Sequence, residues 1–161
     1  RLLQNIRARI PNVALRTTFI VGFPGETAED FAELEGFIDE IGFDHVGVFT
    51  YSHEEGTSAF DLKDDVPAAV KKKRQERLMA RQRQLVAARQ QARIGERVRL
   101  VVDGPSPEHE LVVQGRLAGQ APEIDPVVYL TDCDPTAFAK GIFVDVEIVG
   151  SQEYDLVARP V

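Results

Sequence analysis

The sequence predicts two structural classes in one chain, an α/β segment over residues 1–66 and an all-β barrel over residues 95–161, joined by a long helix over residues 67–94. Three observations predict this. A strand, a helix and a second strand follow one another before residue 52, which makes a right-handed βαβ unit with parallel strands. From Glu96 onward the apolar residues alternate with polar ones, which is typical of strands. The charge also changes sign at both boundaries.

The charge blocks follow these segments closely. Residues 1–66 carry 5 basic and 13 acidic side chains, residues 67–94 carry 9 and 1, and residues 95–161 carry 5 and 12. The balances are −8, +8 and −7, and they sum to the formal net charge of −7. The apolar content of 43% and charged content of 28% are those of a globular protein, and no apolar run has the length of a membrane span.

The stretch over residues 16–27 organises the first segment. Residues 19–21 form a continuous apolar run, as expected of a parallel strand covered on both faces. Residues 23–26 fit a type II turn, in which Gly25 supplies the positive φ. Because ligands in α/β proteins bind at the carboxyl ends of parallel strands, the backbone around Gly22 is the first place to look for a cofactor. The alternative is a well-formed turn that binds nothing.

A helix over residues 28–41 follows, and its ends carry clear signals. Thr27 is expected to be the N-cap, with Asp30 completing a capping box, and Gly42 ends the helix. Residues 45–51 form the second strand. Since two parallel strands do not make a stable domain, we expect this segment to be the last part of a larger α/β sheet or barrel, with the missing strands N-terminal to Arg1.

The long helix begins after Pro67 and is strongly basic. Its run over residues 71–74 reads Lys-Lys-Lys-Arg, which is a pattern found in nucleic-acid-binding proteins. The alternative, which we favour, is a solvated face that lies against acidic neighbours.

Five short strands follow in the last segment, and we expect them to form a small antiparallel barrel of the oligonucleotide-binding type. They are expected over residues 97–102, 111–117, 127–130, 142–148 and 154–157.

No catalytic group can be defended from the chemistry of the residues alone. Cys133 is the only cysteine, which excludes an internal disulfide and a cysteine-ligated metal cluster within the chain, and fits a reducing compartment such as the cytoplasm. None of the three histidines, His45, His53 and His109, is spaced with another ligand as a metal site requires. We therefore expect no metal site.

The motifs of the chain resemble those of the radical S-adenosylmethionine methylthiotransferases. Residues 16–27, followed by Asp30-Phe31, resemble the penultimate strand region of that family, and residues 45–52 with Glu55-Gly56-Thr57 look like its last barrel strand. Val66-Pro67 looks like the link to its C-terminal TRAM domain, with which residues 95–161 are expected to coincide. The resemblance covers essentially the whole chain.

This resemblance implies a fold and cofactors that the residues alone do not. Residues 1–66 would be the C-terminal part of a partial TIM-like radical S-adenosylmethionine barrel. Full-length members use S-adenosylmethionine and two 4Fe-4S clusters held by cysteines, which are absent here, so the chain alone should be inactive. It would keep one wall of the S-adenosylmethionine pocket, formed by five residues: Ile20, Val21, Gly22, Phe49 and Tyr51.

The segment Ala-Pro-Glu-Ile-Asp over residues 121–125 is similar to the branch of the family that modifies an aspartate of a small-subunit ribosomal protein. That resemblance implies a basic ribosomal protein as partner, with Glu123 and Asp125 as candidate substrate-binding residues. An acidic barrel should repel phosphate backbones, so nucleic acid is disfavoured as a partner of this domain. Two alternatives stay open: the branch that modifies transfer RNA, and a non-catalytic binding module.

Overall fold

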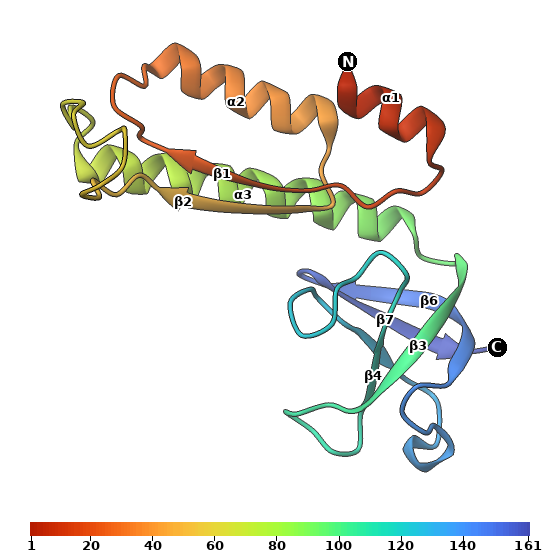
Figure 1. Cartoon of the computed structure of the whole chain (residues 1–161). Helices are drawn as coiled ribbons and strands as arrows, with labels where there is room; N and C mark the ends of the chain where they lie inside the picture. The colour runs from red at the N-terminus through yellow and green to blue at the C-terminus, as the bar shows by residue number, and fades with distance from the viewer. The chain divides into compact units, whose positions relative to one another are not determined.

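The computed structural model describes residues 1–161 and divides the chain into two compact units, Arg1–Leu85 and Val86–Val161. The division falls within the long helix α3 (Ala68–Ala92), close to the helix expected over residues 67–94 (Figure 1). The first unit is α/β and the second is a barrel of strands. None of the helices combines the length and apolar character needed to cross a membrane.

The first unit contains the expected strand–helix–strand order. Its elements are α1 (Leu2–Arg9), β1 (Arg16–Val21), α2 (Ala28–Ile41), β2 (His45–Thr50) and the first part of α3. β1 and β2 pair in parallel, in a register that places Arg16 beside His45 and Val21 beside Thr50. The predicted strand–helix–strand order and the parallel pairing of the two strands are therefore confirmed.

The turn and caps around α2 also form as the sequence predicts. The amide of Glu26 donates to the carbonyl of Phe23 at 2.9 Å, and Gly25 has the positive φ, +85°, that the turn needs. The Thr27 hydroxyl accepts from the Asp30 amide and the Asp30 carboxylate accepts from the Thr27 amide, which completes the capping box. Gly42 ends α2 in the left-handed conformation.

The sheet of the first unit is covered on one face only, so the expectation that residues 19–21 are buried on both faces is wrong. Val21 and Val48 pack with Phe31 and Ile38 of α2 and with Leu78 of α3. Ile20 and Phe49 point to the other face, where they are 59% and 61% exposed. Successive residues of a strand face opposite sides, and both helices pack on the Val21 side, so nothing in this chain covers Ile20.

Side chains of α3 satisfy carbonyls along β2 in place of a neighbouring strand. Gln75 Nε2 donates to the Val48 carbonyl at 2.7 Å, and Gln82 Nε2 donates to the Phe43 carbonyl, just before β2, at 3.0 Å. An open strand edge is a site of unwanted pairing unless something covers it. Side chains of α3 therefore cover part of the open edge of β2.

Three arginines of α3 pair with acidic residues of α2 and of the turn before it. Arg74 pairs with Glu26, Arg77 with Glu35 and Arg81 with Asp39, at distances of 2.5 to 2.6 Å. This confirms the expected contact with acidic neighbours, and Lys72 and Lys73 are exposed as expected.

The basic run departs from that expectation at Lys71, which is buried and thus not part of a solvated face. Lys71 lies one turn before Gln75 and two turns before Leu78, so it belongs to the stripe of α3 that faces the sheet.

The second unit is a closed five-stranded barrel with the order β3-β4-β5-β7-β6. Its strands are β3 (Arg97–Pro105), β4 (Val113–Arg116), β5 (Val128–Leu130), β6 (Phe143–Gln152) and β7 (Asp155–Pro160), with a short 3₁₀ helix, η1 (Pro135–Ala137), before β6.

The expected all-antiparallel arrangement is wrong at one pair, because β5 and β7 run parallel. The other four pairs are antiparallel. A closed ring with an odd number of strands cannot alternate in direction at every pair, so one parallel pair is unavoidable.

The barrel core consists of inward-facing aliphatic side chains that alternate along the strands: Leu100, Val102, Val113, Val128, Leu130, Val146, Ile148, Leu156 and Ala158. Gly115 of β4 faces this core where no side chain fits. A Cβ at this position would lie 2.4 Å from the carbonyl oxygen of Val101 and 2.6 Å from Cδ2 of Leu100. Each of the five strands expected from the period-two pattern overlaps one strand of the barrel.

Candidate functional site

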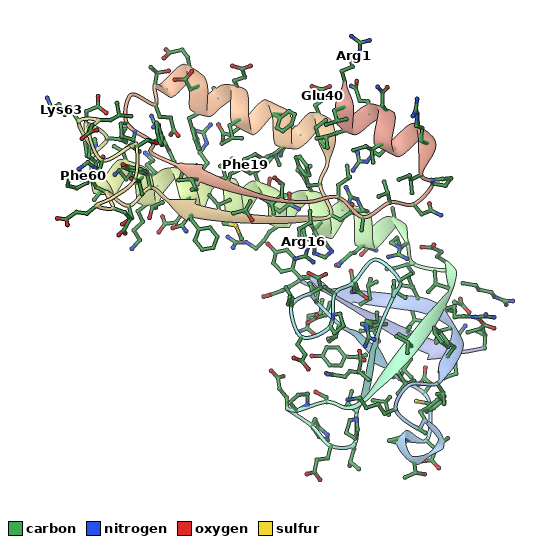
Figure 2. All side chains as sticks on the ribbon, in the orientation of Figure 1. Arg1, Arg16, Phe19, Glu40, Phe60 and Lys63 are labelled. Carbon is green, nitrogen blue, oxygen red and sulfur yellow. The ribbon has the colours of Figure 1, made fainter.

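The candidate site of the first unit lies where β1 and β2 end. The chain leaves β1 through Gly22 into the turn before α2, and it leaves β2 through Tyr51 into an irregular segment over residues 51–66 (Figure 2, where Phe60 and Lys63 mark it). The amide of Tyr51 donates to the carbonyl of Val21 at 2.8 Å, so the two exits are held side by side.

A buried lysine from α3 connects these exits. Lys71 is 6% exposed, and its Nζ lies 2.7 Å from both carboxylate oxygens of Asp64. The same ammonium lies 3.4 Å from the Tyr51 carbonyl oxygen and 4.9 Å from the centre of the Tyr51 ring. A buried charge is costly unless it is paired and hydrogen-bonded, and this lysine has both kinds of partner.

A second ionic contact fixes the turn after β1. Glu26 Oε2 accepts from the Gly22 amide at 2.9 Å, while its Oε1 lies 2.5 Å from Arg74 Nη1. The Gly25 amide donates to Asp65 Oδ1 at 2.8 Å, which joins this turn to the segment after β2. Both exits are therefore held in one polar network that α3 anchors.

The five predicted cofactor residues fall into different environments. Ile20 and Phe49 are neighbours in register on the open face of the sheet. Tyr51 lies at the end of β2, with its hydroxyl 3.3 Å from His53 Nδ1 and donating to the Ala59 carbonyl at 3.3 Å.

Val21 and Gly22 do not reach the open face. The side chain of Val21 is fully buried in the helix-covered core, so it cannot contact a ligand there. Gly22 is buried, its amide is bound by Glu26, and a Cβ on it would lie 2.3 Å from Lys71 Cγ. Val21 and Gly22 are buried because α2 and α3 pack against the side of the sheet that Val21 faces.

Sequence reasoning missed Lys71, Asp64 and Arg74 as residues that build this site. The signal was present for Lys71, because its spacing to the buried Leu78 puts it on the inward stripe of α3. No sequence signal paired Lys71 with Asp64, which lies in a segment without regular structure.

In the barrel, the two predicted substrate residues differ in exposure. Glu123 is exposed and has a positive φ of +60° in the connection between β4 and β5. Asp125 is half-buried, and its Oδ2 accepts from the Ala121 amide at 2.6 Å. Glu123 is thus accessible to a partner, whereas the Asp125 carboxylate is used within the chain to hold the conformation of the connection between β4 and β5.

Two further acidic side chains lie near the outward-facing Tyr129 of β5. Tyr129 points outward between the buried Val128 and Leu130. Burial raises the pKa of Tyr129, and the nearby carboxylates of Asp155 and Glu108 raise this pKa further. An acid from the connection between β3 and β4 and an acid from the start of β7 therefore both act on the Tyr129 hydroxyl.

No group of three or more His, Cys, Asp or Glu side chains could hold a metal ion. Cys133 is half-buried next to the barrel core. Burial, followed by Asp132 and Asp134, raises the pKa of the Cys133 thiol, so the thiol is protonated at neutral pH and is a poor metal ligand.

Comparison with known proteins identifies the parts of this architecture. A family model described as the TRAM domain matches residues 94–161. The chain is 50% identical over 160 residues to the ribosomal protein uS12 methylthiotransferase RimO of Anaeromyxobacter sp. strain K, covering 99% of this chain and 34% of the relative. The RimO of Myxococcus xanthus is 44% identical over 99% of this chain and 33% of the relative.

A third relative matches over a similar length. The RimO of Aquifex aeolicus is 43% identical over 98% of this chain and 36% of the relative. The chain is homologous to the C-terminal portion of RimO-type methylthiotransferases. It spans about a third of the length of the curated relatives that it matches. The five-stranded barrel lies within the residues that the TRAM model matches, and the two-stranded sheet lies in the preceding part of the chain, which is also similar to RimO.

Proposed function

We propose that this chain is part of a RimO-type enzyme that uses S-adenosylmethionine to methylthiolate an aspartate of ribosomal protein uS12. The observation that carries the proposal is the similarity to RimO proteins at 42 to 50% identity across nearly the whole chain, in the α/β unit as well as in the TRAM domain. A shared TRAM domain alone would leave the activity open, because a fold hosts many functions.

The proposed role of the first unit is to provide one wall of the S-adenosylmethionine pocket. Ile20 and Phe49 fit this role, since they offer adjacent apolar surface on a sheet face that nothing in the chain covers. An adenine ring can pack on such a surface. Tyr51 would close the pocket at the strand ends, and Lys71 and Arg74 would keep Tyr51 and Gly22 in place.

S-adenosylmethionine would supply the radical-generating group and the methyl group. What these residues contribute is binding and orientation, and no proton transfer step is assigned to them. The two 4Fe-4S clusters of the family do not fit the residues present, because one cysteine with a raised pKa cannot provide a cluster site. Any cluster would be held by residues outside this chain.

The proposed role of the TRAM domain is to recognise a basic protein substrate. Glu108, Glu123 and Asp155 lie on or beside the β4–β5 side of the barrel, which is the side that small barrels of this kind use for ligands. A negative surface attracts a basic protein and speeds the encounter. The same surface disfavours a phosphate backbone, which argues against the transfer-RNA branch.

The test is the modification state of uS12 in cells. We expect deletion of the gene that encodes this chain to remove the methylthio group from uS12, as read by mass spectrometry of the ribosomal protein. A complementing copy should restore it, and a copy without residues 95–161 should restore it poorly.

Two outcomes would favour the alternatives. Loss of methylthio-adenosine from transfer RNA with unchanged uS12 would favour the transfer-RNA branch. No change in either substrate would favour a non-catalytic binding module.

A further inference from the structure

Four aromatic rings form a row at the strand ends, outside the apolar core clusters of the first unit. Phe23 follows β1, and Tyr51, His53 and Phe60 belong to the segment after β2. Ring centres are 5.2 Å apart from Phe23 to Tyr51, 6.3 Å from Tyr51 to His53, and 4.6 Å from His53 to Phe60. These four residues are called the aromatic row below.

The rings at the ends of the row are open to solvent. Phe23 is 43% exposed and Phe60 is 38% exposed. Tyr51, one of the two inner rings, already contacts a cation, because the Lys71 ammonium lies 4.9 Å from its centre. The row therefore has a chemistry suited to positive charge, with ring surface left over for an external group.

The local charge supports the same kind of ligand. Glu54 follows His53 directly and Asp61 follows Phe60 directly, with Glu55 between them, and all three are exposed. The other two acids of the segment are engaged within the molecule, Asp64 by Lys71 and Asp65 by the Gly25 amide. Lys63 is the single basic residue of the segment over residues 51–66, so the balance around the row stays negative.

We propose that the aromatic row, with Glu54, Glu55 and Asp61, docks an arginine-containing basic segment of a protein partner. A guanidinium group stacks on aromatic rings and pairs with carboxylates, so it uses both features of this surface. The row lies at the same end of the sheet as Gly22 and Tyr51, which is where the proposed cofactor wall ends. The identity of the partner, a basic ribosomal protein, rests on the proposed function, whereas the chemistry of the surface does not.

The experiment titrates the 161-residue chain with hexa-arginine and follows the NMR signals of the Phe23, His53 and Phe60 rings. We expect these signals to shift with hexa-arginine, to shift less with hexa-lysine and to stay unchanged with hexa-glutamate. Phe23→Leu and Phe60→Leu keep apolar volume but remove the ring, and each should weaken arginine binding by about threefold.

Phe143→Leu is the matched control. Phe143 is an exposed aromatic residue of the barrel, and the same substitution there should leave the arginine titration of the row unchanged. Thermal unfolding of each variant checks that the first unit stays folded. Should a Leu variant unfold, the ring shifts of the unaltered chain, with the hexa-lysine and hexa-glutamate comparison, decide the question.

Three results would overturn the proposal. The first is the absence of ring shifts with hexa-arginine. The second is arginine binding that weakens in Glu54→Gln and Glu55→Gln but not in Phe23→Leu and Phe60→Leu. Such a result would mean that charge attraction alone, without the rings, accounts for the binding. The third is a shift of the same rings by S-adenosylhomocysteine that hexa-arginine does not compete with, which would give the row to the cofactor pocket.

The uS12 modification test separates this proposal from the proposed function. If uS12 keeps its methylthio group when the gene is deleted, but arginine binds at the row, only the identity of the partner is refuted. If the deletion removes the methylthio group from uS12, but arginine does not bind at the row, only the docking surface is refuted.

Discussion

Lys71 lies so close to Gly22 that a Cβ on the glycine would be 2.3 Å from Lys71 Cγ. This contact brings the inward stripe of α3 against the exit of β1. Gly22 also has a φ of +76°, which a residue with a side chain adopts only with strain. The glycine is therefore required by both packing and backbone conformation.

We expect Gly22→Ala to destabilise the first unit by about 2 kcal/mol or more, since overpacking and backbone strain add. Native-state hydrogen exchange at the amides of β1 and β2 measures this. Gly36→Ala is the control: Gly36 lies in α2 with nothing within 4 Å of a built Cβ, so its substitution should stabilise by up to about 1 kcal/mol. If Gly22→Ala and Gly36→Ala changed stability equally, the close contact between Lys71 and Gly22 would be contradicted.

Gln75→Leu should weaken the edge of β2. The substitution leaves the Val48 carbonyl without its donor, and an unpaired buried polar group costs about 1–3 kcal/mol. Hydrogen exchange should be faster in β2 than in the unaltered chain. Gln91→Leu, on the exposed side of α3, should have little effect. Unchanged protection in β2 would mean that water replaces Gln75 without loss.

Gly115→Ala should destabilise the TRAM barrel without affecting the first unit. A methyl group there meets the Val101 carbonyl oxygen and the Leu100 side chain, and relief requires movement of backbone in β3. We expect a loss of about 1–3 kcal/mol, measured by urea unfolding of the barrel. Gly141→Ala, where a built Cβ meets nothing within 4 Å but φ is +88°, reports the cost of backbone strain alone.

Thr27→Ala should alter the acid response of α2. The Thr27 amide and hydroxyl lower the pKa of Asp30 below its usual 3.8. A lowered pKa in the folded state means stability that is present above the unfolded value and is lost as pH falls through the folded value. The variant loses the hydroxyl, so the Asp30 pKa should rise and stability should depend less on pH in this acidic range.

Carboxyl NMR titration checks this change directly. Asp134 provides an internal reference, because its pKa is lowered by Thr136 in the other unit and should not move. A pKa of Asp30 that stays the same in the variant would assign the shift to the Thr27 amide alone.

Glu123→Lys should slow association with a basic ribosomal protein. The exposed Glu123 can be reversed without touching the fold, whereas Asp125 accepts from the Ala121 amide, and its reversal would disturb the connection. We expect affinity to fall by about two- to fivefold at low salt, less at high salt. Glu33→Lys on α2 makes the same charge change elsewhere and should have a smaller effect. Equal effects would mean that only net charge matters.

The sequence predicted local structure well because local signals carry it. Thr27, Asp30 and Gly42 define the ends of α2, and alternating aliphatic residues define the barrel core. The parallel pairing of β5 and β7 could not be read from alternation, because period two is the same for both strand directions. It follows instead from closing a ring of five strands.

The five cofactor residues stay a prediction, and the structure adds where each side chain lies. Ile20 and Phe49 share the open face, but Val21 and Gly22 are buried by helices whose side of the sheet the strand pattern does not give. The pairing of Lys71 with Asp64 depends on the path of an irregular segment. Such long-range contacts leave no periodic trace in the sequence.

The way in which α3 covers β2 also has a consequence during synthesis. Gln82 follows Thr50 by 32 residues, so a ribosome adding about 5–20 residues per second needs roughly 2 to 6 seconds to complete the cover after it has finished the strand. For that interval the β2 edge and the part of the Val48 side that α3 covers stand open on the nascent chain. The interval is the period in which a chaperone would have most to protect, and slow codons between these positions would lengthen it.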